Sequence, residues 1–187
     1  MNNKLLLLGA TFCIALSLFI GNPLQAQAAG QVAQTATTAT TKTVPVVNPQ
    51  VQITGSITIC EGYEQQVLPI INAYRAQAGL PALTWNDGAA AAARARAQEI
   101  VYLFSHTRPD GSDCLTALTE AGEINPWRGE NIAGGQTSPS EVMYTWMNSP
   151  GHRANILHEK FASVGVACIY IPNSTYGFYW VEMFVGY

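Results

Sequence analysis

The chain is short of charge and has no cluster of basic residues. Its 187 residues include 9 Lys and Arg and 12 Asp and Glu, so 11% are charged, whereas soluble domains average about 25%. Binding to nucleic acid or to an anionic membrane surface depends on clustered Lys and Arg. With a net charge of −3 and no basic cluster, the sequence argues against both partners.

The charge deficit is concentrated in the first third of the chain. Residues 1–60 contain only Lys4 and Lys42 and no acidic residue, whereas residues 61–187 hold 7 basic and 12 acidic residues. The chain therefore has two parts of different composition. The charged part is long enough for one domain with its own hydrophobic core.

Apolar runs long enough to span a bilayer are missing as well. The longest, over residues 5–20, follows Lys4 and precedes a small-x-small pattern at 26–28. It falls short of the ~20 residues that a transmembrane helix needs, and the pattern is typical of an export signal. We expect residues 1–28 to be a cleaved signal peptide, with no transmembrane segment after cleavage; an uncleaved anchor is the alternative.

Residues 29–59 lack both apolar periodicity and large side chains. They are mostly Gln, Ala, Thr, Val and Pro, a composition that cannot bury a core. We expect a disordered spacer that holds the folded part away from a surface or membrane, with a propeptide or solubilising tail as the alternative. The predicted domain then covers residues 60–187.

Cysteine is scarce. Signal cleavage would remove Cys13 and leave Cys60, Cys114 and Cys168, so at most one intramolecular bridge can form. The sequence leaves its pairing open. Three cysteines are too few for a disulfide scaffold, so a hydrophobic core must hold the fold.

Periodicity predicts four helices followed by a hairpin of two strands. Apolar residues at helical spacing end at 79–81, and Pro69 inside this run implies a late start or a kink in the first helix. Alternating apolar residues near the C-terminus predict two antiparallel strands, so the fold class is α+β. The later elements are expected as helices over 89–104, 114–122 and 139–148 and as strands over 164–170 and 176–185.

Two of the three histidines lie beside predicted turns. His106 follows the second helix and precedes 108–111, whose Arg-Pro-Asp-Gly sequence is typical of a type I turn. A short helix is predicted from Ser149, as its N-cap, to Leu157. This helix would place His152 in its first turn, where the helix dipole disfavours a charged imidazole.

Glu130 lies between these histidines, in a glycine-rich stretch over 127–135. A carboxylate there can orient an imidazole or bridge to a metal, although local hydrogen bonding by these polar residues is the plainer alternative. The third histidine, His158, is expected to be solvated. Four aromatic residues are expected in the core rather than in a site: Trp127, Tyr144, Trp146 and Trp180.

Several motifs resemble the bacterial branch of the CAP superfamily, whose domain is also called the SCP domain. The superfamily groups cysteine-rich secretory proteins, antigen 5 and plant pathogenesis-related proteins. The resemblance covers residues 61–187, and its motifs agree in order and spacing. They lie at 104–106, 129–133, 146–157 and 164–167.

The resemblance implies a three-layer α-β-α sandwich with an antiparallel central sheet. It also implies a cleft lined by two histidines and two acidic residues, of which His106, Glu130 and His152 match three. The family's second acid falls at Ser149 here. In some relatives the two histidines bind zinc, so His106 and His152 are the implied zinc ligands. Lipid binding, proteolysis and roles in secretion-linked defence or adhesion are all attached to the family.

The sequence therefore predicts a secreted binding or interaction module, including one retained at the cell surface. Its cleft of His106, Glu130 and His152 would hold zinc, a small lipid-like ligand or a cell-envelope component. The alternative is a hydrolase acting on peptides or envelope material, with a histidine as general base and Ser149 as nucleophile. Because Ser149 is already explained as an N-cap, binding is favoured over catalysis. A purely structural extracellular protein is the third hypothesis.

Overall fold

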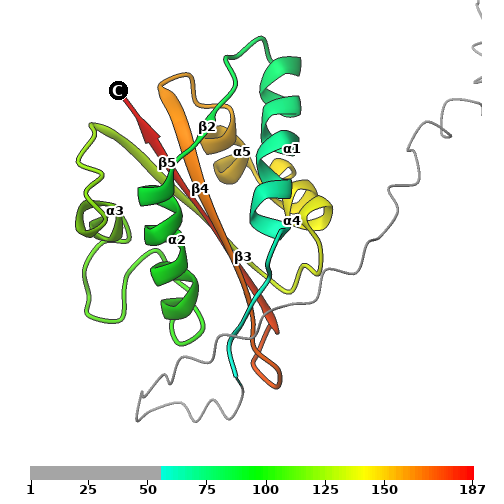
Figure 1. Cartoon of the computed structure of the whole chain (residues 1–187), viewed down its shortest axis with the longest axis vertical. Coiled ribbons are helices and arrows are strands. Elements are labelled where there is room, and N and C mark those ends of the chain that lie inside the picture. The colour runs from blue at the N-terminus through cyan, green and yellow to red at the C-terminus, as the bar shows by residue number, and fades with distance from the viewer. Residues whose placement is uncertain (1–55) are drawn as a thin grey trace, which may run out of the picture. The chain divides into compact units, whose positions relative to one another are not determined.

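The computed structural model describes residues 56–187, so the predicted signal peptide and most of the predicted spacer lie outside the described residues. The described part forms five helices and five strands (Figure 1). None of these helices is both long and apolar enough to cross a membrane. In chain order the elements are β1 (Thr58–Ile59), α1 (Tyr63–Gln77), β2 (Thr84–Trp85), α2 (Asp87–Glu99), α3 (Thr116–Glu120), β3 (Trp127–Gly134), α4 (Pro139–Met147), α5 (Pro150–Ile156), β4 (Phe161–Tyr170) and β5 (Phe178–Gly186).

The sheet is antiparallel apart from one short edge pairing. β5 lies between β4 and β3, and the two-residue strands β1 and β2 both pair with β4, β2 in parallel. β4 and β5 form the predicted C-terminal hairpin, with Tyr170 opposite Phe178 and Phe161 opposite Gly186. Because β5 has a strand on each side and is buried from residue 179 to 186, it is the central strand.

Helices cover both faces of the sheet and give three layers (Figure 1). α2 and α3 pack on one face, and α1, α4 and α5 pack on the other. β5 serves both cores in alternation, since Val181 and Met183 face α2 while Trp180 and Phe184 face the other helices. The predicted α-β-α sandwich is thus confirmed.

Helix α2 lies close to the sheet because most of its inner face consists of alanines. Ala89, Ala90, Ala93 and Ala97 are almost completely buried. Beneath them a Cβ atom added at Gly165 of β4 would lie only 1.9 Å from the backbone nitrogen of Ala90. Backbone therefore meets backbone at this crossing, and the position accepts only glycine.

One predicted helix end is wrong, and one alternative for the first helix is excluded. α1 begins at Tyr63 and runs through Pro69, which excludes the late start. Pro69 and Gln65 are both exposed, so the carbonyl that loses its helical partner stays open to water. α2 ends at Glu99, five residues before its predicted end. The chain turns there, and the carbonyl of Ser105 then accepts a hydrogen bond from the Arg96 guanidinium.

Three strands of the structure were not predicted. The glycine-rich stretch over 127–135 had no predicted element, and it forms β3, whose glycines lie where aromatic rings cross the strand: a Cβ at Gly129 would meet the ring of Phe161, and one at Gly134 the ring of Tyr176. β2 has only two residues, too few for a visible period. β1 falls inside the predicted spacer, and Ile57 before it is buried, so the folded part begins before residue 60.

The aromatic predictions are half correct. Trp146 and Trp180 are fully buried, whereas Trp127 and Tyr144 are exposed. His158 is not simply solvated, because it is half-buried and its ring centroid lies 5.4 Å from that of Trp127. Trp127 thus covers the end of the sheet together with this histidine.

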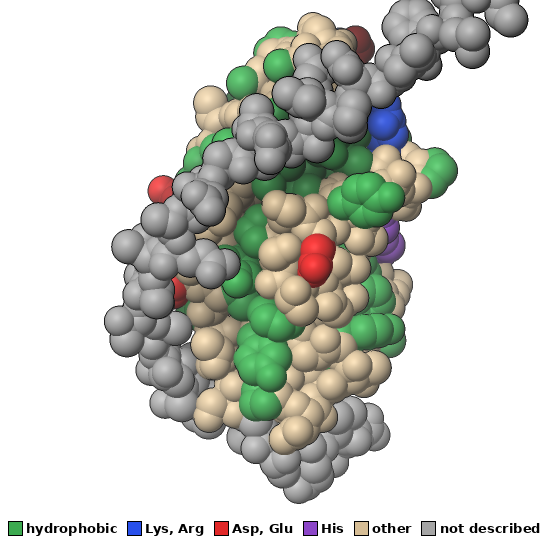
Figure 2. Space-filling view, turned by 90° about the vertical axis from the view of Figure 1, so that its right-hand side faces the viewer, with side chains coloured by type: hydrophobic (Ala, Val, Ile, Leu, Met, Phe, Trp, Pro, Cys, Tyr) green, Lys and Arg blue, Asp and Glu red, His purple; other side chains and the backbone are tan. Residues whose placement is uncertain are grey.

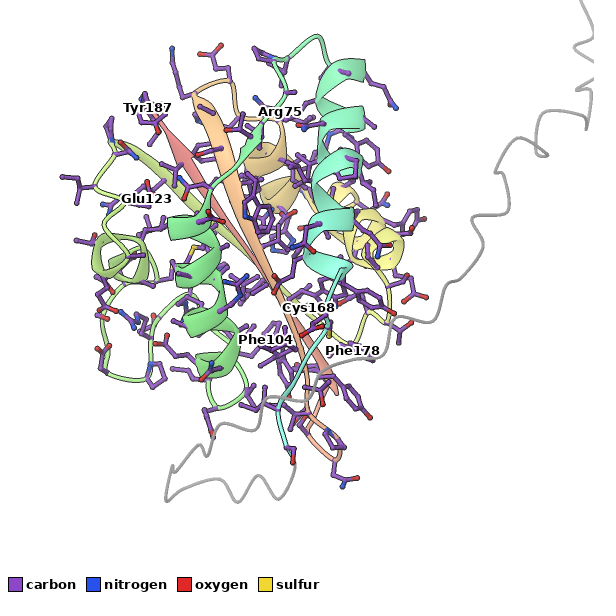
Figure 3. All side chains as sticks on the ribbon, viewed as in Figure 1. Arg75, Phe104, Glu123, Cys168, Phe178 and Tyr187 are labelled. Atoms are coloured by element: carbon purple, nitrogen blue, oxygen red, sulfur yellow. The ribbon has the colours of Figure 1, made fainter. Side chains whose placement is uncertain are left out.

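Arg75 is a buried cation bonded only to main-chain carbonyls in the described part of the chain. From α1 it donates to the carbonyl oxygens of Pro81, Ile156, His158 and Phe161 over 2.8 to 3.3 Å (Figure 3). Burial lowers its pKa, and these bonds satisfy the guanidinium. Arg75 therefore ties α1 to the end of α5 and the start of β4.

We predict that Gly165→Ala destabilises the domain by more than about 3 kcal/mol, because the new methyl group must push α2 off the sheet. Denaturant unfolding measures the change. Gly151→Ala is the matched control: a Cβ there meets nothing within 4 Å, so its effect should stay within about 1 kcal/mol. Equal effects of the two substitutions would contradict the close packing of α2 on β4.

Candidate functional site

The three predicted site residues come from three separate segments. Glu130 lies in β3, His106 in the loop after α2, and His152 in the first turn of α5. Glu130 and His106 are in direct contact, with 2.7 Å between Oε1 and Nδ1. No hydrogen bond joins the His152 ring to either side chain in residues 56–187, although the charge of His106 is close enough to act on it.

The Glu130 carboxylate is buried and binds two partners at once. Its side chain is 1% exposed, and its second oxygen accepts a 2.8 Å bond from Nε of Arg96, which is 0% exposed. Arg96 was not predicted as a site residue. A signal was present, since an arginine between alanines that face the sheet needs buried hydrogen-bond acceptors.

Arg96 also fixes the backbone beside His106. Its remaining nitrogens donate to Glu99 and to the carbonyl of Ser105, each over 2.6 Å. Burial works to lower the pKa of Arg96, but the bonds to Glu130 and Glu99 outweigh it and raise the pKa. The guanidinium stays charged and holds both the carboxylate and the loop.

A second arginine braces the same loop from the other side. Arg108 donates to both oxygens of Glu99 and to Glu120, and the bonds to these acids raise its pKa. The amide of Gly111 donates to the Arg108 carbonyl over 2.9 Å, which confirms the predicted turn. The backbone of His106 is therefore rigid while its side chain stays 55% exposed.

The two site histidines have opposite pKa shifts. The hydrogen bond that His106 donates to Glu130 raises the pKa of His106, against the opposing effect of burial. Burial, and then the charge of His106, lower the pKa of His152. The sequence predicted a neutral His152 from the helix dipole, whereas in the structure burial is the main cause of its lowered pKa. The Nδ1 atom of His152 is buried without a partner in the described structure.

Cys114 joins the site from a segment that the sequence did not connect with it. Ligand atoms of His106, Cys114 and Glu130 all lie within 4.8 Å of one another, and this group does not include His152. The amide of Cys114 donates to the His106 carbonyl over 2.9 Å. Burial, and then the charge of Glu130, raise the pKa of Cys114 to about 12, so its sulfur is a thiol.

Ser149 does not cap α5 with its side chain. It occupies the N-cap position, and its carbonyl accepts the amide of Arg153 over 2.9 Å, but its hydroxyl makes no capping hydrogen bond. The expectation that capping occupies this hydroxyl is therefore wrong. Ser149 is half-buried and lies three residues before His152.

Two asparagines attach α5 to β3. The side-chain amide of Asn155 donates to the Glu130 carbonyl and to Oδ1 of Asn131. That of Asn131 donates to the His152 carbonyl over 3.1 Å and to Glu182 over 2.9 Å. This network places His152 relative to Glu130 without a direct bond between their side chains.

Glu182 is the buried acid beneath this network. It lies in β5 directly opposite Asn131, and its second oxygen has no partner in the part of the chain described. Burial raises its pKa to about 8, against the lowering effect of the Asn131 bond. Near neutral pH the side chain is therefore mostly a neutral acid.

A surface pocket of about 440 Å³ lies away from these residues. It is at the start of α4, and it is lined by Gly135, Gln136, Ser140, Glu141, Tyr144 and Thr145. Figure 2 shows the face of α1 and α4, on which charged side chains are few and hydrophobic ones are interspersed. None of the predicted site residues lines this pocket.

Comparison with known proteins finds a matching family and a similar curated protein. Residues 68–184 match the model of the cysteine-rich secretory protein family, CAP. The Bacillus subtilis protein YkwD, itself uncharacterized, is 34% identical over 135 residues, which are 71% of this chain and 51% of that protein. The chain thus spans about half the length of this curated relative.

Two solved structures share the fold. One is an extracellular protein containing an SCP domain from Bacillus anthracis, with a TM-score of 0.60 and 26% identity, covering 67% of this chain and 41% of that one. The other is an outer surface protein from Borrelia burgdorferi, with a TM-score of 0.63 and 17% identity, covering 70% and 96%. At that identity the second likeness concerns the fold alone.

We predict that NMR titration gives His106 a pKa above 6.5 and His152 a pKa below it, because Glu130 stabilises one charged ring and burial disfavours the other. In Glu130→Gln the pKa of His106 should fall, since its carboxylate partner is gone. Signals are assigned with His106→Ala and His152→Ala. The reverse order of the two values would contradict the geometry of the site.

We predict that the free energy of unfolding depends on pH through the titration of Glu182, and that Glu182→Gln removes this contribution. The folded pKa of about 8 exceeds the ordinary value of 4.5, so Glu182 stabilises the fold below pH 4.5 and this contribution is lost as pH rises to about 8. Relative to the variant, the parent's free energy of unfolding should fall by up to about 1.4 kcal/mol per pH unit. Denaturant unfolding at several pH values measures this. Glu159→Gln, at an exposed position, controls for loss of a carboxyl, and a constant difference between parent and Glu182→Gln would refute the prediction.

Proposed function

The chain belongs to the cysteine-rich secretory protein family, CAP, and from this premise we propose that it is a secreted binding module rather than an enzyme. The proposed ligand site consists of His106, Glu130 and His152. Export is supported by the predicted signal peptide and by the Bacillus anthracis relative, which is an extracellular protein. The predicted spacer fits a domain retained at the cell surface.

The observation that carries this proposal is the engagement of the Glu130 carboxylate. One oxygen binds His106 and the other binds Arg96, so both are occupied before any ligand arrives. A general base needs a carboxylate oxygen within reach of the substrate's proton. Glu130 is instead placed to orient the His106 ring, which supports binding.

The two imidazoles offer complementary polar groups to a ligand. His106 uses Nδ1 for Glu130, which leaves Nε2 as the ring nitrogen of an exposed side chain. His152 supplies a neutral ring whose buried Nδ1 has no partner among the described residues. A small ligand with a polar or anionic head, including a lipid-like one, suits this pair because the raised pKa of His106 favours its charged form.

Zinc is the second ligand that we propose for the same residues. Imidazole nitrogens are preferred zinc ligands, and a carboxylate on the far nitrogen of a ligating histidine is a common arrangement. Glu130 bonded to His106 fits that arrangement. Zinc and a proton then compete for His106, so binding should weaken as pH falls. Arg96 beside Glu130 disfavours direct coordination by the carboxylate or by Cys114.

Hydrolysis of peptides or cell-envelope material is the alternative function. One observation favours it, namely that the Ser149 hydroxyl is not used as a cap. His152 would then act as general base toward Ser149. The pairing lacks an orienting acid for His152, since Glu130 is bonded to His106, and we therefore rank it second.

We predict that native mass spectrometry and calorimetry detect zinc or a retained extract lipid on the parent protein. Binding should weaken at least about 10-fold in His106→Ala and His152→Ala, and by a similar factor in Glu130→Gln. His158→Ala is the matched control and should bind like the parent. Equal binding by all variants would contradict the assignment of these three residues to the ligand site.

A panel of peptides and peptidoglycan fragments tests the alternative. We expect no turnover by the parent. Turnover that disappears in both Ser149→Ala and His152→Ala would instead establish the hydrolase and overturn the proposed ranking.

A further inference from the structure

Two of the three described cysteines face each other across the sheet. The register of β1 and β4 pairs Thr58 with Tyr170 and Ile59 with Ile169. The next opposed pair is Cys60 and Cys168, and the amide of Cys60 donates to the Cys168 carbonyl over 3.0 Å. Directly opposed residues of antiparallel strands point to the same face, so both thiols lie on the α1 side.

Both cysteine side chains belong to one core. Cys168 is fully buried in the core beneath α1 and α4, and Cys60 packs against that core from its rim. Burial, and then the neighbouring Cys60 side chain, raise the pKa of Cys168. Figure 3 shows Cys168 beside the segment that leads into α1.

The backbone spacing suits a covalent link. In a hydrogen-bonded antiparallel pair the Cα atoms are about 5.5 Å apart, and disulfides span roughly 4.4 to 6.8 Å. Cys114 is excluded as a partner, because it lies with Glu130 on the α2 side of the sheet. The geometry thus selects one pairing of the three that the sequence leaves open.

We propose that Cys60 and Cys168 form an intramolecular disulfide when the protein meets a disulfide oxidant, and that this bond locks β1 onto β4. Cys60, Cys114 and Cys168 are free cysteines in the described structure. The proposal does not depend on the ligand site, since neither cysteine contacts His106, Glu130 or His152.

The reaction is thiol–disulfide exchange. Cys60, the half-buried sulfur, attacks a small-molecule disulfide as its thiolate, forms a mixed disulfide and releases one thiolate. Cys168 then loses its proton and attacks the Cys60 sulfur, which forms the Cys60–Cys168 bond and expels the second thiolate. The two protein thiols are oxidised by two electrons in all, and the oxidant becomes two thiols after taking up the two protons.

The bond would secure the weakest part of the sheet. β1 has only two residues and a single neighbour, β4, so few hydrogen bonds oppose its detachment. A link from Cys60 to Cys168 closes a loop that contains every helix of the domain. Long loops gain the most from a crosslink because the unfolded chain loses more freedom. The N-terminal segment would then leave the domain from a fixed point.

The test is peptide mapping after oxidation. The full chain is equilibrated with oxidised glutathione, free thiols are alkylated, and digested peptides are identified by mass spectrometry. We expect a Cys60–Cys168 linked peptide, with Cys114 alkylated only after unfolding. If Cys60 and Cys168 are both alkylated in the oxidised sample, or if either is linked to Cys114 instead, the proposal is overturned.

Thermal unfolding gives an independent measurement. The oxidised parent should melt at least about 5 °C above the reduced parent. Cys60→Ser should lose this difference, and Cys114→Ser, the matched control, should keep it. A mapped disulfide that leaves the melting temperature unchanged would contradict the proposed role of the bond in holding β1.

Discussion

The buried ion pair of Arg96 and Glu130 is the interaction on which the site depends. It joins α2 to β3 across two layers, with both side chains almost completely hidden from water. Breaking such a pair leaves an uncompensated buried charge, which typically costs 3–5 kcal/mol. The same guanidinium holds the Ser105 carbonyl, so the loop that carries His106 is positioned by the residue that neutralises Glu130.

This ion pair needs α2 at a short distance from the sheet. The distance is set elsewhere, where the alanine face of α2 meets Gly165 of β4 with backbone against backbone. Around the ion pair three cations, Arg96, Arg108 and charged His106, meet three acids, Glu99, Glu120 and Glu130. The balanced charges make the region electrically neutral when His106 is protonated, which is the state that its raised pKa favours.

Local signals predict the elements but not their partners. The helix predicted over 139–148 and the alternating C-terminal strands follow from neighbouring residues, and the structure confirms both. β3 was not predicted because Gly129 and Gly134, which make room for aromatic rings, are not typical strand residues. His106, Glu130 and His152 were singled out by their local contexts and grouped by the family resemblance, whereas Arg96 and Cys114 were not connected with the site. Those two act through contacts 34 and 16 residues away in the chain, which no local period encodes.

Glu130 and Glu182 lie on adjacent strands but have different hydrogen-bonding partners. Glu130 faces α2, where Arg96 and His106 both donate to it. Glu182 faces the opposite side, where within residues 56–187 it receives only the neutral amide of Asn131, and burial raises its pKa to about 8. Asn131 lies next to Glu130 in β3, bonds to Glu182 and also holds the His152 carbonyl. The backbone of His152 is therefore held by the neutral side chain of Asn131. The ring of His106 is instead held by Glu130 of the ion pair. For this reason the pKa values of the two imidazoles shift in opposite directions.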